Sequence, residues 1–335
     1  RDGETNIPVV GGSSFNLIVT NIEKIRITAE TIRKMDLGNL FAGGRGEEDA
    51  KRAVANSRLQ KLASLPNLAI FSDEAHHLYG QALDTRLKRV RQTVNYLADQ
   101  TRVICVVNTT GTPYYRRQPL KDVVIWYGLS KGISDGYLKE LAGNIQAYDF
   151  ADKVEQYVAH VIKDFFETYG KVRLLNDAPA RLAMYFPQTD DLDELRPVID
   201  QALVEVGQSP ALCLVNTSLS KQADIDAFNR LNDPAAPHRV ILLVNKGTEG
   251  WNCPSLFACA LVRRLKNSNN FVLQVASRCL RQVPGNTHKA RVYLSQDNFS
   301  ILDRQLQETY GETIADLNRE VTETRRARIV LRKRE

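Results

Sequence analysis

The sequence predicts an α/β protein made of two domains, each built on a parallel sheet. Its short apolar runs lack the alternation of a half-exposed strand, so we interpret them as strands buried on both faces. These runs are residues 15–19, 68–71, 103–107, 182–186, 211–215, 240–244, 256–262 and 292–294. Helical spacing marks the longer stretches between them, at 84–98, 154–169, 192–206 and 221–231. Strands that alternate with helices are typical of α/β folds.

The chain length also predicts two domains. With 335 residues, it exceeds the roughly 250 residues at which single cores stop growing. The segment 114–150 has turns at Gly132 and Gly136 and no long apolar run, so we place the boundary there. We assign residues 1–140 to the first domain, 141–300 to the second and 301–335 to a basic helical extension.

The composition is that of a globular protein, with 43% hydrophobic and 25% charged residues, and this argues against global disorder. No run of 18 apolar residues occurs, so we expect no membrane span. The five cysteines include no C-x-x-C pair, which favours reduced thiols and a cytoplasmic location. The net charge of +6 suits a polyanionic partner but is weak evidence by itself.

An acidic pair, Asp73-Glu74, follows the apolar run 68–71. Ligands of open α/β sheets bind outside the carboxyl ends of the strands. An aspartate there can hold Mg²⁺ through water, and a neighbouring glutamate can orient or deprotonate the water that attacks a phosphate. A polar turn at a strand end is the alternative interpretation. The residues Ala75-His76 that follow make the pattern more specific than a bare acidic pair.

Three further blocks follow in order. Thr110-Gly111-Thr112-Pro113 comes after the run 103–107 and is, by itself, a turn with hydroxyl caps. The segment 246–254, Lys-Gly-Thr-Glu-Gly-Trp-Asn-Cys-Pro, has glycines that let the backbone approach a ligand closely. The segment 274–281, Gln-Val-Ala-Ser-Arg-Cys-Leu-Arg, places two arginines three residues apart, on one face if the segment is helical. A solvated pair of surface arginines is the alternative there.

In this order the four blocks resemble the motifs of superfamily 2 helicases. The resemblance is to the DEAH-box-like branch that includes the restriction subunit of type III restriction enzymes, and it covers roughly residues 15–295. It implies two RecA-like parallel-sheet domains, the first of them incomplete. It also implies that ATP and Mg²⁺ bind between the domains and that hydrolysis moves the protein along nucleic acid.

The resemblance also implies roles for individual residues. Asp73 would serve Mg²⁺ and Glu74 the attacking water, while His76 would couple the nucleotide to the second domain. The other implied roles are coupling for Thr110 and Thr112, nucleotide binding for Gly247, Thr248, Gly250 and Gln274, stabilisation of transition-state charge for Arg278 and Arg281, and contact with the nucleic-acid backbone for Thr20 and Asn21. The sequence departs from the family pattern at Asn252, where Asp is usual, and at Ser277, where Gly is usual.

A phosphate-binding loop of the form Gly-x-x-x-x-Gly-Lys-Ser/Thr does not occur in the sequence. Either the chain is a fragment of a motor, or it is a degenerate helicase-like module that scaffolds a larger complex without hydrolysing ATP. We favour the fragment, because Glu74 and both arginines are retained. On that interpretation the intact parent is an ATPase and this chain alone is inactive.

The expected partner is nucleic acid, DNA rather than RNA, because the resemblance is to restriction motors. Other subunits of a restriction or defence complex are further expected partners. The motor part of an ATP-dependent restriction endonuclease is a second alternative, and it would require a nuclease domain that we do not find in the sequence.

Overall fold

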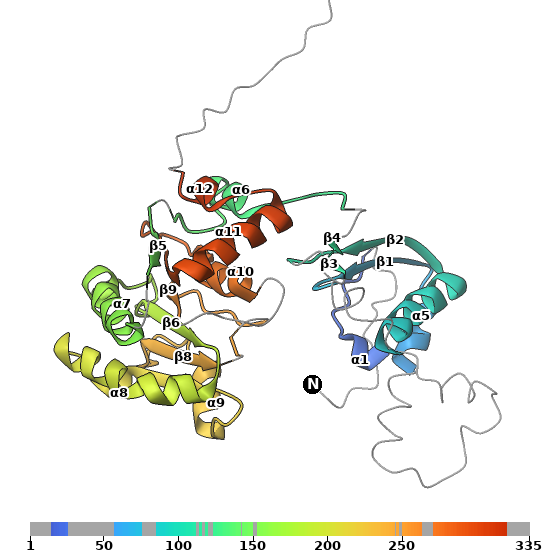
Figure 1. Cartoon of the computed structure of the whole chain (residues 1–335). Coiled ribbons are helices and arrows are strands. Elements are labelled where there is room, and N and C mark those ends of the chain that lie inside the picture. The colour runs from blue at the N-terminus through green and yellow to red at the C-terminus, as the bar shows by residue number, and fades with distance from the viewer. Residues whose placement is uncertain are drawn as a thin grey trace, which may run out of the picture. The chain divides into compact units, whose positions relative to one another are not determined.

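The chain divides into two compact units, Arg1–Val123 and Val124–Glu335. A computed structural model, drawn in Figure 1, describes part of each unit. The described residues are 15–25, 57–75, 85–111, 114–115, 118–119, 123–141, 143–149, 153–244, 246–247, 250–262 and 271–319. The division lies inside the segment 114–150 but before residue 140, because residues 124–140 cluster with the second unit.

The first unit pairs two parallel strands, β1 (Asn67–Ser72) and β2 (Arg102–Asn108), joined through helix α5 (Thr85–Gln100). A helical segment at 57–63 packs Leu59 and Leu62 with Leu97 of α5 into a small core. The short strands β3 (Tyr114–Tyr115) and β4 (Gln118–Pro119) form an antiparallel pair. The helix and both long strands were predicted from the sequence and are confirmed.

Two expectations for the first unit are wrong. Residues 15–19 form no strand, and α1 (Ile22–Ile25) is the first element after them. Strands β1 and β2 are not buried on both faces, since Phe71 is 73% and Ile104 61% exposed. The physical reason is that the sheet of the described part of this unit has only these two strands. The inward residues of β1, such as Ile70, pack on the small core, whereas the opposite face is uncovered.

The second unit contains a six-stranded parallel sheet in the order β5-β10-β9-β6-β8-β7. The strands are β5 (Ile145–Tyr148), β6 (Arg181–Phe186), β7 (Cys213–Asn216), β8 (Val240–Val244), β9 (Leu256–Leu261) and β10 (Arg291–Ser295). Five of them were predicted from apolar runs. The predicted α/β fold, with a parallel sheet in the second unit, is therefore confirmed.

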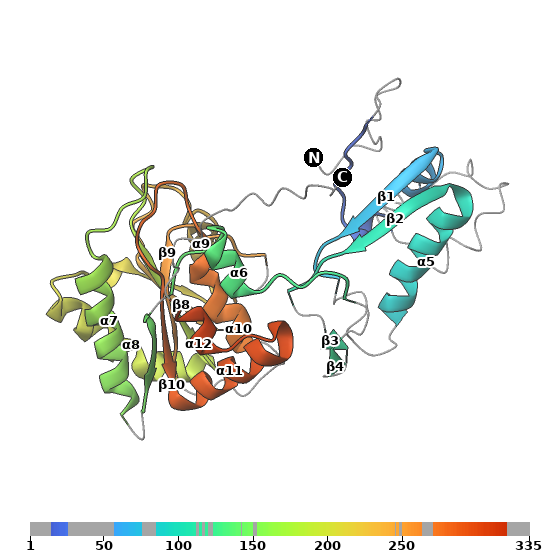
Figure 2. The ribbon, with the colours of Figure 1, turned by 90° about the horizontal axis from the view of Figure 1, so that it is seen from above.

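Helices cover both faces of this sheet, as Figure 2 shows. Helices α7 (Val154–Tyr169) and α8 (Thr189–Glu205) pack on one face, against residues such as Met184 of β6. The opposite face carries α9 (Gln222–Asn229), α10 (Phe271–Ala276) and α11 (Gln296–Tyr310), which pack against residues such as Tyr185. Because successive β6 side chains enter different cores, the whole strand is buried. This double burial explains the continuous apolar runs.

The segment after residue 300 belongs to the second unit's core up to the end of α12 (Ile314–Leu317). Leu302, Leu306, Ile314 and Leu317 are buried there. A capping box formed by Thr313 and Asp316 begins α12. Residues 301–317 of the expected extension therefore pack in the second unit, and its basic residues at 325–334 lie outside the described part of the chain.

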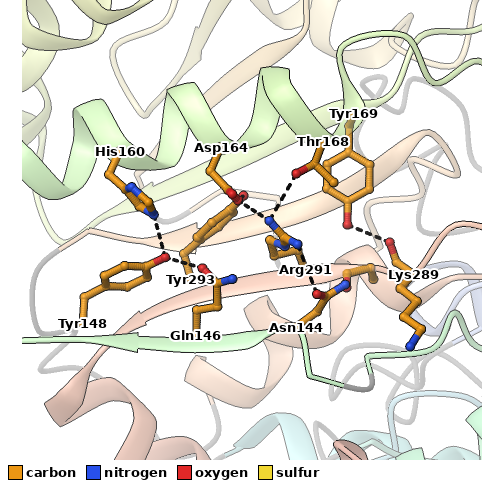
Figure 3. Close-up of polar contacts among 11 residues, drawn as sticks. Asn144, Gln146, Tyr148, His160, Asp164, Thr168, Tyr169, Lys289, Arg291 and Tyr293 are labelled. Atoms are coloured by element: carbon orange, nitrogen blue, oxygen red, sulfur yellow. Dashed lines mark hydrogen bonds and ion pairs between the residues drawn. The ribbon is translucent and has the colours of Figure 1, made fainter. Parts of the chain in front are cut away.

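A polar network fastens α7 to the strands β5 and β10 (Figure 3). Asp164 of α7 accepts hydrogen bonds from Arg291 and from the Tyr293 hydroxyl, at 2.5 Å for the latter. Arg291 also donates to Asn144 Oδ1 at 3.2 Å, just before β5. These hydrogen bonds give the polar side chains between α7 and the sheet the partners that buried polar groups require. Among the described residues, no helix combines the length and apolar character needed to cross a membrane.

Candidate functional site

In the first unit, the predicted acidic site lies where β1 and β2 end. The parallel register places Ser72 beside Asn108, so Asp73 and Thr109 leave the sheet next to each other. The Thr109 hydroxyl donates to Asp73 Oδ1 at 3.0 Å. Backbone bonds from Thr109 N to Ser72 O and from Ala75 N to Thr109 O, both 2.9 Å, join the two turns. The two strand ends thus form one structural unit.

Glu74 has a left-handed backbone, with φ of 49°. Its amide donates to Asp73 Oδ1 at 2.9 Å, so this oxygen is held by two donors. A residue other than glycine in this conformation carries strain of order 1–2 kcal/mol. Backbone outliers of this kind cluster at functional sites.

Asp73 fits a hydrated Mg²⁺ ion. Its carboxylate is exposed, and one of its oxygens is oriented by Thr109 and the Glu74 amide. Mg²⁺ keeps several of its waters and needs only one or two carboxylates from the protein. In the part of the chain that the structure describes, no three His, Cys, Asp or Glu side chains gather into a direct metal site. The exposed Asp73 carboxylate could hold such an ion through the waters that Mg²⁺ retains.

The sequence analysis did not name Thr109, whose hydroxyl contacts Asp73. The missed signal was positional, because Thr109 directly follows β2 as Asp73 directly follows β1. His76 and Thr112 lie outside the described residues. Thr110 is described and half-buried.

Replacing Thr109 by Val removes the hydroxyl that orients Asp73 while keeping the side-chain shape. A hydrogen bond to a charged group contributes about 1.5–3 kcal/mol. In the full protein, on the ATPase function proposed below, we therefore expect turnover of ATP to fall about tenfold or more. Thr109→Ser retains the hydroxyl and serves as the matched control. Steady-state ATP hydrolysis measured against Mg²⁺ concentration checks this, and equal rates for the Val and Ser variants would contradict a role for the bond.

Thr20 and Asn21, the predicted contacts with nucleic acid, precede α1. Asn21 Oδ1 accepts a hydrogen bond from Lys24 N at 3.1 Å, a bond typical of a helix N-cap. The Thr20 hydroxyl donates to Asn21 O at 3.4 Å. Local structure therefore explains both polar residues, and contact with nucleic acid stays a prediction.

In the second unit, the glycine-containing segment after β8 needs its glycines. Gly247 has φ of 66° and Gly250 φ of 70°. A Cβ at Gly247 would come within 2.8 Å of Leu243 and 3.0 Å of Trp251. The hydroxyl of Tyr185, on strand β6, donates to Gly247 O at 3.0 Å and holds the turn against the sheet. Thr248 lies outside the described residues.

The predicted arginines meet this same segment. Arg278 Nη1 donates to Trp251 O at 3.3 Å, and Arg281 Nη1 donates to Asn252 Oδ1. Asn232 Nδ2 donates to Asn252 O at 2.8 Å. The third and fourth sequence blocks thus form one site, and Asn252 acts in it as a neutral acceptor for Arg281.

The spacing of the two arginines suggested that they share one helix, but they do not. Helix α10 ends at Ala276, the 3₁₀-helix η2 covers Ser277–Leu280, and Arg281 follows it. Arg281 instead pairs with Leu138 in an isolated β-bridge. Even so, the 3₁₀-helix lets Arg278 and Arg281 contact two consecutive residues, Trp251 and Asn252. Gln274 lies on α10, where its carbonyl accepts from the Ser277 hydroxyl at 3.1 Å.

Comparison with known proteins gives likenesses in structure alone. A scan against protein-family models finds no match, and a search of curated proteins finds none either. Three solved structures illustrate the likenesses. The ATP-dependent type ISP restriction-modification enzyme LlaBIII bound to DNA has 15% identity and a TM-score of 0.44, with 75% of this chain and 21% of that chain covered.

The second is a fragment of a putative HsdR subunit of a type I restriction enzyme from Vibrio vulnificus, with 15% identity and a TM-score of 0.46, covering 67% of this chain and 44% of that one. The third is the DUF1998 helicase MrfA bound to DNA and AMPPNP, with 10% identity, a TM-score of 0.48 and coverage of 77% and 34%. The chain therefore spans less than half the length of each.

Proposed function

We propose that this chain is the motor part of a nucleic-acid-dependent ATPase of the helicase type. The observation that carries the proposal is the acidic pair at the carboxyl end of β1, whose aspartate is held by a hydroxyl from the end of β2. An Asp-Glu pair oriented in this way suits Mg²⁺-dependent phosphoryl transfer. The two arginines that contact the loop after β8 supply a second group of charges that suits phosphate.

In this proposal Asp73 holds Mg²⁺ through water and Glu74 orients the water that attacks the γ-phosphate. Arg278 and Arg281 stabilise the negative charge of the transition state. Mg²⁺–ATP, when bound, supplies the phosphoryl group and neutralises charge on its oxygens. The finer assignments, a DEAH-box-like motor of a type III restriction enzyme that acts on DNA with other subunits, are part of the same proposal.

A helicase-like scaffold that does not hydrolyse ATP is the second candidate. It is favoured by one observation, that the sequence has no Gly-x-x-x-x-Gly-Lys-Ser/Thr loop. Backbone amides and the lysine of such a loop hold the β- and γ-phosphates. The motor therefore needs that loop from elsewhere in the full protein, whereas the scaffold does not.

Phosphate release by the full protein, measured with ATP in the presence and absence of Mg²⁺, separates the two candidates. The motor predicts Mg²⁺-dependent release. Binding of nucleic acid without any phosphate release, under conditions where ATP itself binds, would support the scaffold and contradict the motor.

A further inference from the structure

A buried lysine joins the two segments that carry the arginine site. Lys139 is fully buried in the second unit. Its Nζ donates to the carbonyl oxygens of Pro254 at 3.3 Å, Leu256 at 3.2 Å and Cys279 at 3.3 Å, and also to the Arg281 carbonyl. Two of these acceptors follow the Trp251-Asn252 turn, and the other two flank the end of η2. One side chain thus fixes both segments.

The chemistry of this contact requires a cation. A lysine ammonium has three N–H donors and no acceptor, and here it meets four carbonyl oxygens. Burying a charge is costly unless it is compensated, and an aliphatic side chain would fill the same space without that cost. The ammonium also lies 4.5 Å from the centre of the Phe257 ring, over its face. The hydrogen bonds to the four carbonyl oxygens, and not the packing of the side chain, therefore explain why a cation is buried here.

The segments held by Lys139 are those that place the two arginines. Arg278 lies one residue before Cys279, and the Arg281 carbonyl is itself an acceptor. On the opposite side, Pro254 lies two residues after Asn252, the acceptor of the Arg281 guanidinium. Without the ammonium, the four carbonyls would lose their common donor and the two segments could separate.

We propose that Lys139 is a positioning residue for Arg278 and Arg281, and that its ammonium holds the arginine segment against the Trp251-Asn252 turn. The catalytic part of this inference rests on the proposed function. The structural part, that the charge of Lys139 sets the distance between two segments, does not.

The ionisation of Lys139 offers a direct way to test the contact. Burial lowers the pKa of Lys139 to about 8. The titratable and charged groups that face it are the thiols of Cys253, Cys259 and Cys279 and the guanidinium of Arg281. Burial raises the pKa of the Cys253 and Cys259 thiols, so these stay neutral near pH 8. Above pH about 8 the neutral amine keeps only two N–H donors for four carbonyls.

Trp251 reports on the turn that Lys139 holds. The sequence contains two tryptophans, and Trp251 stacks on Phe228 with ring centroids 5.0 Å apart. In a Trp126→Phe variant of the full protein, Trp251 is the only tryptophan of this chain. We expect its fluorescence to change in a transition centred near pH 8, and the same transition to be missing from the double variants with Lys139→Met and Lys139→Arg.

The fluorescence result decides the structural claim. No transition between pH 7 and 9.5 in the Trp126→Phe protein would overturn it, and so would a transition that persists in both double variants, because it would then belong to a thiol. The first outcome needs no Lys139 variant, so the claim stays testable even if Lys139→Met fails to fold.

Turnover then decides the catalytic claim. We expect kcat of the wild-type protein to fall as the pH rises through about 8, and kcat of Lys139→Arg to stay level over that range. Lys139→Met should lower kcat about 100-fold at pH 7, the cost of a misplacement of about 1 Å, with much less effect on KM for ATP. Normal turnover in a folded Lys139→Met protein would overturn the positioning role. No turnover in the wild type would instead overturn the proposed function and leave the fluorescence test standing.

Discussion

Replacing Glu74 by Gln is expected to abolish ATP hydrolysis by the full protein and to leave nucleotide binding intact. The amide cannot accept a proton from the attacking water, and loss of a general base costs about 100-fold to 10,000-fold in rate. Asp73, which would hold the ion, keeps its bonds to Thr109 and to the backbone amide of residue 74 in this variant. Phosphate release and binding of a fluorescent ATP analogue, measured on the same preparation, check both halves of the expectation.

The left-handed backbone at Glu74 supplies a control for this variant. Glycine adopts that conformation without the strain that other residues carry. Glu74→Gly should therefore be as inactive as Glu74→Gln, and its unfolding temperature should be no lower than that of the wild-type protein. Normal turnover in either variant would remove Glu74 from the mechanism. A large loss of thermal stability in Glu74→Gln would instead mean that the carboxylate supports the fold.

In the proposed motor, replacing Arg281 by Ala is expected to lower kcat by about 1,000-fold or more, within the range known for an arginine that stabilises phosphoryl-transfer charge. Arg281 is the more exposed of the two arginines, and its guanidinium is held only by the neutral Asn252 among the bonds described for it. A phosphate can compete for such a guanidinium more readily than it could for one paired with a carboxylate. Steady-state kinetics with ATP measures the loss.

Two matched variants test whether geometry or charge is responsible. Arg281→Lys keeps the charge but loses the planar fork of donors, so we expect most of the activity to stay lost. Arg319→Ala removes an arginine of the same unit whose side chain is 78% exposed and pairs with Asp316, and it should leave kcat unchanged. Equal losses for Arg281→Ala and Arg319→Ala would indicate a general effect of charge and contradict the assigned role.

Where two layers of helices cover a sheet, the sequence predicted its strands well. The runs at β6, β8 and β9 are continuous because both faces of each strand are buried. The edge strand β5 was missed, since it is short and only Ile145 is fully buried. At residues 15–19 the error was the opposite one, because a strand was predicted and none is present. Their apolar side chains resemble a strand, yet Val19 is 89% exposed and no partner strand lies beside them among the described residues.

The candidate site, too, was only partly predictable from the sequence. The order of the motifs gave candidate side chains for the chemistry, but it could not predict which of them are in contact. The contact of Thr109 with Asp73 depends on strand register, and the contact of Arg281 with Asn252 depends on η2 ending the helix early. Lys139 had no signal at all, because a single lysine in a turn-rich segment resembles any surface lysine until the fold buries it.

In the proposed motor, nucleic acid stimulates ATP hydrolysis. The most direct test of this stimulation is the rate of phosphate release by the full protein with Mg²⁺–ATP, measured alone and with double-stranded DNA, single-stranded DNA or RNA, with Glu74→Gln as the blank. We predict that DNA raises the rate of the wild-type protein well above its rate without nucleic acid and that the blank stays flat. A rate that no nucleic acid changes, or one equal to that of Glu74→Gln under every condition, would contradict the account.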